Sequence, residues 1–360
     1  MSIHFHPLTI RDIRRETDDC VSISFAIPSE LSEQFVYREG QNITLRVYID
    51  GEEIRRSYSV CSSPLENELR VAVKAVPGGL FSQYANTRLK RGDTIEVLPP
   101  TGKFYTPLEP ERAKNYVAFA AGSGITPILS IIKTVLATEP ASRFTLVYGN
   151  RNRHSIIFRE QLEALKNRYM ERFRLIHILS REKTDLPIQY GRIDATKCRE
   201  LENHLIDWKQ VDHFYICGPE AMIFSTRDYL LNAGVPAQRI HFELFTTPGQ
   251  KSGPKTEEAS GTGDLGPTAR VQVKVDGRSF EMKVPYQGVP ILDAALQAGA
   301  DLPYACKGGV CCTCRARLVK GEVEMDQNYA LEPEELEAGF ILTCQSHPRT
   351  EEIVVDFDYR

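Results

Sequence analysis

Four cysteines near the C-terminus constrain this 360-residue chain more than any other feature. Cys306, Cys311 and Cys314 follow the pattern C-x4-C-x2-C, and Cys344 stands 29 intervening residues further on. A loop with this spacing can bring three thiolates together, and the Gly308-Gly309 pair gives its backbone the freedom to curl around bound sulfur atoms. The pattern predicts a 2Fe-2S cluster, which needs four thiolates on two irons.

A structural zinc site is the alternative for these cysteines. Zinc sites of this kind usually use paired C-x2-C units, whereas here the fourth cysteine stands alone. The spacing therefore favours the cluster. Cys312 is a fifth thiol inside the loop, and we expect it to point away from the cluster instead of serving as a ligand.

The composition excludes several classes of protein. A hydrophobic content of 42% is typical of packed globular cores, and the length suggests two to three domains. The net charge of −4 provides no basic surplus for a nucleic acid partner. No apolar run approaches the roughly 18 to 20 residues of a membrane span, and residues 1–10 do not resemble a signal peptide. We expect a cytoplasmic protein with no membrane partner.

Changes of sequence texture predict three domains and a linker. Residues 1–108 contain short β-rich runs separated by turn signals, which predicts an antiparallel barrel. Residues 109–245 alternate strand-like and helix-like stretches, which predicts a doubly wound parallel α/β domain. Residues 246–268 are rich in Gly, Pro, Ser and Thr and predict a flexible linker. Residues 269–360 carry 10 basic and 15 acidic side chains, so the acidity of the chain belongs to this last domain.

A candidate flavin site begins with the tetrapeptide Arg56-Ser57-Tyr58-Ser59. An arginine fork can bind a phosphate, an aromatic ring can stack on an isoalloxazine, and a hydroxyl can hydrogen-bond the reactive flavin nitrogen. The glycines of the stretch 78–82 would open a helix whose free N–H groups accept phosphate. Such a tetrapeptide is more often an ordinary strand, so its interpretation depends on a nucleotide loop downstream.

That loop is AAGSGITP, residues 120–127, between an apolar strand and a helix. Gly122 and Gly124 would allow close approach of the backbone to a pyrophosphate, and Thr126 and Pro127 suit the N-cap and first turn of the helix. The stretch lacks the third glycine of the G-x-G-x-x-G fingerprint, so by itself it is a weak signal.

A second nucleotide motif, Cys217-Gly218-Pro219, follows the apolar strand 214–216 and again precedes a helix. A sulfur at a strand end beside a glycine leaves room for a flat nicotinamide ring. Without the other motifs, Cys217 would more simply be an inert buried thiol.

Together with the Glu243-Leu244-Phe245 ending, these motifs resemble the ferredoxin-NADP reductase superfamily over about residues 7–245, and residues 269–360 resemble plant-type 2Fe-2S ferredoxins. The resemblance implies a flavin-binding barrel, a parallel nucleotide domain and an α+β domain of the β-grasp type. It implies that the cluster ligands are Cys306, Cys311, Cys314 and Cys344. It implies flavin contacts from Arg56, Ser57, Tyr58, Ser59, Val73, Lys74, Val76, Gly79, Phe81, Ser82 and Phe245. It implies nicotinamide-cofactor contacts from Gly122, Gly124, Thr126, Pro127, Cys217 and Gly218. Finally, it implies that Ser59, Cys217 and Glu243 are the catalytic residues.

The nicotinamide cofactor is suggested by Ser180-Arg181, because the superfamily often holds the 2'-phosphate of NADPH with such a pair. NADPH is therefore favoured and NADH remains possible, while an ordinary solvated arginine is the alternative. The expected flavin is FAD, with FMN open.

The order of the domains, with the stretches DLPYACKGGVCCTC and NYALEPEEL, resembles the reductase components of multicomponent oxygenases. A nicotinamide gives two electrons at once and a cluster accepts one, so the flavin must stand between them. We expect electrons to pass from NAD(P)H through FAD and the 2Fe-2S cluster to an oxygenase component, with no general acid or base. The acidic cluster domain would face a basic docking site. One alternative is a reductase for another oxygenase, hydroxylase or desaturase. The others are a zinc-bound interaction module and an iron-sulfur sensor.

Overall fold

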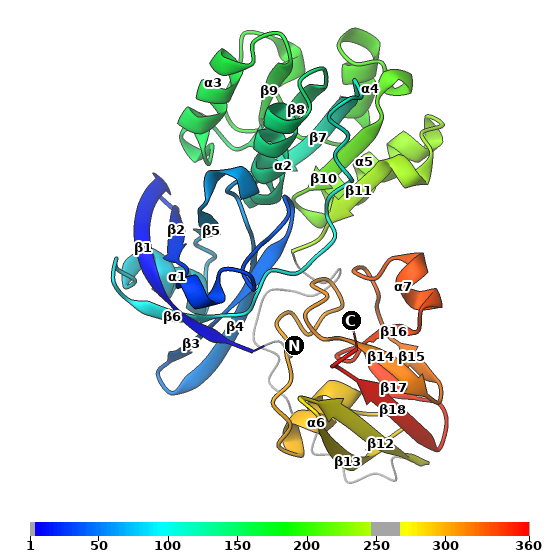
Figure 1. The fold of residues 1–360 in the computed structure, drawn as a ribbon. Helices are drawn as coiled ribbons and strands as arrows, with labels where there is room; N and C mark the ends of the chain where they lie inside the picture. The colour runs from blue at the N-terminus through cyan, green and yellow to red at the C-terminus, as the bar shows by residue number, and fades with distance from the viewer. Residues whose placement is uncertain (1–3, 246–266, 360) are drawn as a thin grey trace. The chain divides into compact units, whose positions relative to one another are not determined.

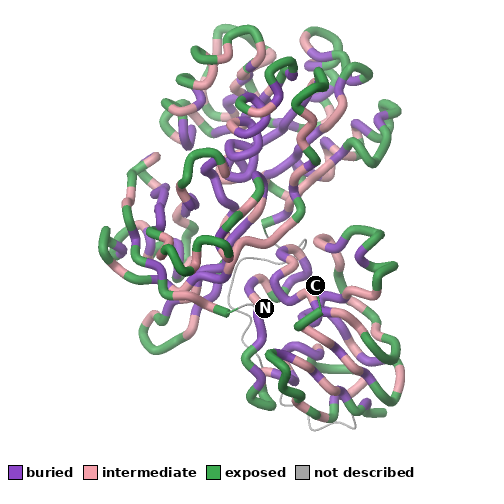
Figure 2. The backbone as a smooth tube through the Cα atoms, in the orientation of Figure 1, coloured by how far each residue is buried: buried purple, intermediate pink, exposed green. Residues whose placement is uncertain are grey.

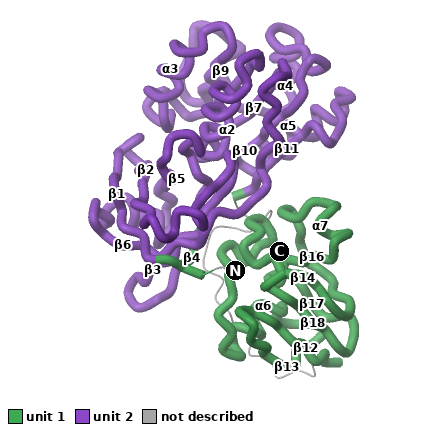
Figure 3. The backbone as a smooth tube through the Cα atoms, viewed as in Figure 1, with its two compact units in different colours: residues 1–6, 55–57, 245–360 green, residues 7–54, 58–244 purple. Residues whose placement is uncertain are grey.

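The computed structural model describes residues 4–245 and 267–359 (Figure 1). These residues form two compact units: residues 7–54 and 58–244 make one, and residues 4–6, 55–57, 245 and 267–359 make the other (Figure 3). The expected linker 246–268 lies outside the described residues except for its last two, and Thr268 already begins a strand. No helix in the described part of the chain is long and apolar enough to span a membrane.

The first sheet has six strands in the order β4-β3-β6-β1-β2-β5, and the β1–β2, β2–β5 and β3–β6 pairs are antiparallel. Asp50 and Gly51 both adopt positive φ, as the tight turn between β3 and β4 requires. The strand that carries Tyr58 ends at Ser59, and Val60 continues it only as an isolated bridge. The elements are β1 (His6–Thr17), β2 (Cys20–Ala26), η1 (Ser29–Leu31), β3 (Asn42–Ile49), β4 (Glu52–Ser59), η2 (Pro64–Glu66), β5 (Leu69–Lys74), α1 (Leu80–Thr87) and β6 (Thr94–Val97).

The second sheet has five parallel strands in the order β11-β10-β7-β8-β9. Its strands run through the buried interior (Figure 2), and β7 reads as a continuous apolar run because helices cover the sheet. The strand order reverses direction at β7, between β8 and β10, and ligands of such sheets bind beyond the carboxyl ends of the strands at this point. The elements are β7 (Asn115–Ala121), η3 (Gly122–Gly124), α2 (Ile125–Thr138), β8 (Arg143–Asn150), η4 (Arg153–Ser155), α3 (Arg159–Arg168), β9 (Phe173–Leu179), η5 (Pro187–Gln189), α4 (Ala195–His204), η6 (Trp208–Gln210), β10 (His213–Cys217), α5 (Glu220–Asn232), η7 (Ala237–Arg239) and β11 (Ile240–Glu243).

The third sheet has the order β13-β12-β18-β14-β16, with a parallel β12–β18 pair among antiparallel neighbours. The alternating side chains Val271, Val273 and Val275 of β12 enter the core, and Asp276-Gly277 form a tight turn with positive φ at both residues. A helix follows Pro290 over residues 291–297. The elements are β12 (Thr268–Val275), β13 (Arg278–Pro285), α6 (Ile291–Gln297), β14 (Arg315–Lys320), β15 (Val323–Met325), α7 (Pro333–Glu337), β16 (Phe340–Leu342), β17 (Ser346–Pro348) and β18 (Glu352–Asp356).

Candidate functional site

The carboxyl ends of β7, β10 and β11 bring the two nucleotide motifs and the Glu243 ending side by side. Cys217 pairs with Ala120 of β7 on one side and with Glu243 of β11 on the other. Gly122 follows β7 directly, at the point where the strand order reverses. The fold thus places three segments that are distant in the sequence at the edge where a dinucleotide is expected.

The glycines of the first nucleotide motif serve different purposes. Gly122 has φ +54°, and a Cβ there would meet nothing within 4 Å, so this position leaves open space for a ligand. A Cβ on Gly124 would lie 2.1 Å from the carbonyl oxygen of Cys217 and 2.7 Å from the nitrogen of Gly218. The missing side chain of Gly124 therefore lets the two motifs pack backbone against backbone, while its contact with a pyrophosphate stays a prediction.

The helix after this loop begins two residues earlier than expected. Gly124 is the N-cap of α2, which starts at Ile125, so Thr126 lies inside the first turn and is not the N-cap. Its hydroxyl donates a hydrogen bond to the carbonyl oxygen of Ser123 at 3.0 Å. Pro127 lies in the first turn as expected, where its missing N–H has no helical partner to lose.

The three predicted catalytic residues form one group. The hydroxyl of Ser59 donates a hydrogen bond to Oε2 of Glu243 at 2.8 Å. Burial raises the pKa of the Glu243 carboxyl from its ordinary value to about 7, although the hydrogen bond from Ser59 lowers it. Burial, aided by the negative charge of Glu243, also raises the pKa of the fully buried Cys217 thiol, which is therefore uncharged at neutral pH.

The glycine loop before α1 is fixed by a close approach and two hydrogen bonds. A Cβ on Gly79 would lie 2.6 Å from Oγ of Ser82, so the glycine is required by a close approach. That hydroxyl accepts a hydrogen bond from the N–H of Val76 and donates one to the carbonyl oxygen of Gly79, which fixes the turn. The side chains of Val76 and Leu80 are 45% and 49% exposed, so the rim of the loop is available to a cofactor.

Other predicted flavin residues differ in how they could contact a cofactor. The side chains of Val73 and Phe81 belong to the barrel core, so each could offer only its backbone. Nζ of Lys74 lies 3.6 Å from a carboxylate oxygen of Asp19. Two predicted residues have exposed side chains: Arg56, whose Nη1 donates to the carbonyl oxygen of Arg55, and Phe245. Ser57 and Tyr58 are half-buried.

The predicted 2'-phosphate pair follows β9 beside the end of β8. The N–H of Ser180 donates to the carbonyl oxygen of Asn150 at 3.0 Å, and the N–H of Arg181 donates to that of Arg151 at 2.8 Å. Both arginine side chains are exposed. Arg151 was not among the predicted residues, although the run Arg-Asn-Arg-His directly after a buried strand is a visible signal.

The four predicted cluster cysteines lie together in the unit that contains residues 267–359. Contacts between thiols join Cys306 to Cys311 and to Cys344, and Cys344 to Cys314. Within the described ranges, no three His, Cys, Asp or Glu side chains gather closely enough to hold a single metal ion. These contacts bring all four predicted thiols into one group.

The backbone of the cysteine loop curls as a cluster site needs. The N–H of Gly308 donates a hydrogen bond to the sulfur of Cys306 at 3.3 Å. Of the two glycines only Gly309 has positive φ, and the curl also uses positive φ at Lys307 and Cys312. The thiol of Cys312 donates to the carbonyl oxygen of Ala330 at 2.9 Å, so it is engaged outside the group of four.

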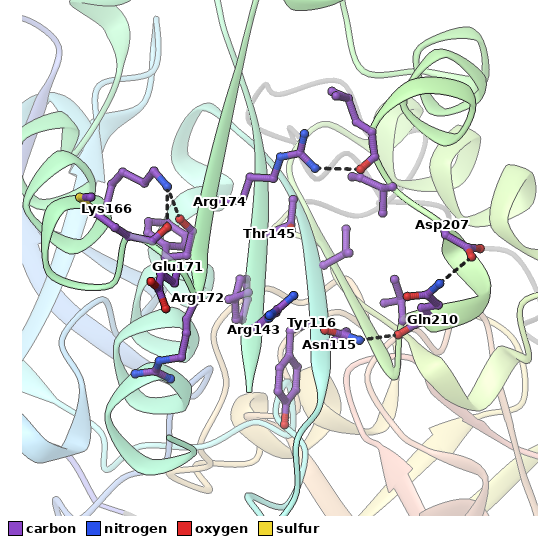
Figure 4. A pocket seen from close by; sticks show the side chains of 17 residues that line it. Asn115, Tyr116, Arg143, Thr145, Lys166, Glu171, Arg172, Arg174, Asp207 and Gln210 are labelled. Carbon is purple, nitrogen blue, oxygen red and sulfur yellow. Dashed lines mark hydrogen bonds between the residues drawn. The ribbon is translucent and has the colours of Figure 1, made fainter. Parts of the chain in front are cut away.

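A hollow of about 530 Å³ lies at the opposite edge of the parallel sheet (Figure 4). It is lined by the amino ends of β7, β8 and β9, and none of the predicted site residues borders it. Lys166 and Arg174 on its rim donate hydrogen bonds to backbone carbonyl oxygens, among them those of Phe173 and Leu205. These charges stabilise the ends of local elements, and the hollow is not the nucleotide site.

Comparison with known proteins agrees with this arrangement. Residues 7–105 match an oxidoreductase FAD-binding domain, residues 119–228 an oxidoreductase NAD-binding domain, and residues 273–349 a 2Fe-2S iron-sulfur cluster binding domain. The expected FAD, nicotinamide and 2Fe-2S cofactors are thereby confirmed, while the choice between NADPH and NADH stays open.

Two relatives match almost the whole chain. One subunit of the 1,2-phenylacetyl-CoA epoxidase of Escherichia coli strain K12 is 47% identical over 98% of this chain and 98% of its own length. The ferredoxin reductase component of the 3-ketosteroid-9-alpha-monooxygenase of Rhodococcus rhodochrous is 34% identical, over 97% of this chain and 96% of its own.

A solved structure confirms the expected fold class. Phthalate dioxygenase reductase, described as a modular structure for electron transfer from pyridine nucleotides to [2Fe-2S], aligns with a TM-score of 0.57 and 24% identity over 98% of both chains. At this identity the likeness concerns the fold alone. The relatives, the three domain matches and the grouped site residues together assign the chain to the family of oxygenase reductases that join flavin-binding and nicotinamide-binding oxidoreductase domains to a C-terminal 2Fe-2S domain.

Proposed function

We propose that this chain is the reductase of a phenylacetyl-CoA epoxidase, delivering electrons from NADPH to the oxygenase component that epoxidises the aromatic ring. The proposal rests mainly on the 47% identity to one subunit of such an epoxidase along 98% of both chains. The second candidate function is that of a reductase for a different oxygenase. The 34% identity to a steroid monooxygenase reductase supports it.

The residues proposed for the chemistry are Ser59, Cys217 and Glu243. Bound FAD and the cluster supply hydride acceptance and single-electron transfer. The chain itself orients the partners: Gly122 leaves room for a flat ring, and the hydroxyl of Ser59 would hold the reactive nitrogen of the flavin. Glu243, with a pKa of about 7, holds a proton within hydrogen-bond distance of that hydroxyl.

Other assignments from the sequence are retained as parts of the proposal. They comprise the domain division 1–108, 109–245, 246–268 and 269–360, the predicted flavin and nicotinamide contacts, and the four cysteine ligands. NADPH is preferred to NADH because Arg181 is exposed beside Arg151 and can bind a 2'-phosphate. We place the protein in the cytoplasm because its donor and its cluster thiolates belong to a reducing compartment.

An anaerobic absorption spectrum of the purified full chain tests the electron path. We expect flavin and iron-sulfur bands that bleach on addition of NADPH, and a slower bleach with NADH. In Cys314→Ala the cluster bands and transfer to the oxygenase should be lost, while NADPH still reduces the flavin. Cys312→Ala is the matched control in the same loop and should keep the cluster bands. A spectrum with flavin bands alone for the unmodified protein would contradict the cluster.

Reconstitution tests the partner. The reduced chain is mixed with the epoxidase oxygenase component and phenylacetyl-CoA, and product is measured against an unrelated Rieske-type oxygenase with its own substrate. Turnover only with the epoxidase supports the proposal. Turnover only with the other oxygenase would support the second candidate.

A further inference from the structure

The segments after β8 and β9 carry a group of charges that the proposed chemistry leaves unexplained. Beyond the strand ends, the pairing of Ser180 with Asn150 and of Arg181 with Arg151 keeps the two segments adjacent. Neither the Arg151 nor the Arg181 guanidinium has a hydrogen bond or ion pair to another described residue. Two exposed arginines with unengaged side chains therefore stand at the edge where the adenosine end of a dinucleotide is expected.

A third arginine nearby is engaged by a carboxylate. Oε2 of Glu182 accepts a hydrogen bond from the N–H of Arg153 at 2.8 Å, and Oε1 accepts one from its Nε. The turn that carries Arg153 is fixed by reciprocal hydrogen bonds between Asn152 and Ser155. Arg153 is thus held in place from both its backbone and its side chain.

Glu182 is ionised in this arrangement. The backbone hydrogen bond from Arg153, followed by the hydrogen bond from its side chain, lowers the pKa of the Glu182 carboxyl below its ordinary value. The pair of Arg153 and Glu182 is therefore neutral as a whole at physiological pH. One arginine of the group contributes little to the positive field at this edge.

We propose that Glu182 sets the donor preference of this chain by holding Arg153 in an ion pair and so withholding it from the 2'-phosphate that distinguishes NADPH from NADH. A phosphate monoester binds arginine forks strongly and is repelled by a neighbouring carboxylate, whereas a 2'-hydroxyl can donate a hydrogen bond to that carboxylate. Arg151 and Arg181 remain to favour NADPH, and Glu182 limits that preference. This inference rests on the proposed use of nicotinamide donors.

Binding of adenosine fragments tests the inference without hydride transfer. Titration calorimetry of the full chain uses adenosine 2',5'-bisphosphate and adenosine 5'-monophosphate as probes. Glu182→Gln keeps the shape of the side chain and removes its charge, so we expect the bisphosphate to bind about three- to tenfold more tightly and the monophosphate to change less than about twofold.

Glu171→Gln is the matched control for total charge. Glu171 is exposed and lies at the other end of β9, about 20 Å away at roughly 3.3 Å per residue, beyond the screening length of about 8 Å in 0.15 M salt. It should leave the affinity of both probes unchanged. An equal gain in this control would overturn the inference, because the effect would then come from net charge alone.

A double-mutant cycle tests the role of Arg153. Arg153→Gln alone leaves the Glu182 carboxylate unpaired and should weaken bisphosphate binding, and in the Glu182→Gln background it should remove the gain. A gain that survives loss of Arg153, or no gain in Glu182→Gln, would overturn the inference. If the unmodified chain binds neither probe and neither nicotinamide reduces its flavin, the proposed function itself fails.

Discussion

Replacement of Glu243 by glutamine should make the reductase unit more stable at alkaline pH. Burial raises the pKa of this carboxyl from 4.5 to about 7, so the folded state holds the proton more tightly than the unfolded state. Stability is therefore full below the unfolded pKa of 4.5 and falls as the pH rises through the folded pKa of about 7. Ionisation of this half-buried carboxyl is what opposes folding above that range.

The magnitude follows from the same two values. At about 1.4 kcal/mol per pH unit, the difference between 4.5 and about 7 corresponds to roughly 3 kcal/mol of lost stability at pH 8. Most of this loss, roughly 2 to 3 kcal/mol, develops between pH 5 and pH 8. Glu243→Gln cannot ionise, so its stability should exceed that of the unmodified chain by more at pH 8 than at pH 5, by about this amount.

Urea unfolding of the flavin-loaded chain at the two pH values measures the effect. The chain has one tryptophan, Trp208, which is 2% exposed in the nucleotide domain, so its fluorescence reports on the unit that contains Glu243. Glu163→Gln on the exposed face of α3 is the control and should follow the unmodified protein. If Glu243→Gln and the unmodified chain lose stability in parallel between pH 5 and pH 8, the carboxyl is not buried in its neutral form and the reasoning is refuted.

Three further predictions concern single residues. Ser59→Ala removes a hydrogen bond that lowers the pKa of Glu243, so the pH at which Glu243 ionises should move upward, and an unshifted midpoint in the pH dependence of urea unfolding would contradict the contact. Gly124→Ala would place a methyl group 2.1 Å from the carbonyl oxygen of Cys217 and should lower thermal stability by about 3 kcal/mol or more, whereas Gly122→Ala meets nothing within 4 Å and should cost only about 1 kcal/mol for its positive φ; equal melting shifts would argue against the close packing. Arg181→Ala should raise KM for NADPH about tenfold or more and leave KM for NADH nearly unchanged in steady-state kinetics, and equal effects would remove Arg181 from 2'-phosphate binding.

The parts of the fold that were predictable are those with a strong local pattern. The alternation of Val271, Val273 and Val275 and the Asp276-Gly277 turn define the start of the third sheet, and helix 291–297 follows from Pro290 and its apolar face. The cysteine spacing likewise predicted which thiols lie together. In each case the information lies within a few residues of the element that forms.

The site was less predictable where contacts join distant segments. The sequence shows glycines at positions 122 and 124 alike, and only the fold reveals that one faces open space while the other faces Cys217. Thr126 has the chemistry of an N-cap, yet the short helix η3 runs directly into α2 and moves the cap to Gly124. The pairing of Glu182 with Arg153 depends on the register of two parallel strands, which a local pattern does not encode.

The close approach of Gly124 to Cys217 has a consequence for building chimeric reductases. The two nucleotide loops are in backbone contact, and the space between them cannot hold a methyl group. The conformation of each loop therefore depends on the other. A loop taken alone from another reductase would pack against a second loop whose backbone it does not fit. We therefore expect that donor specificity can be exchanged between such enzymes when the segment after β7 and the segment after β10 are replaced together.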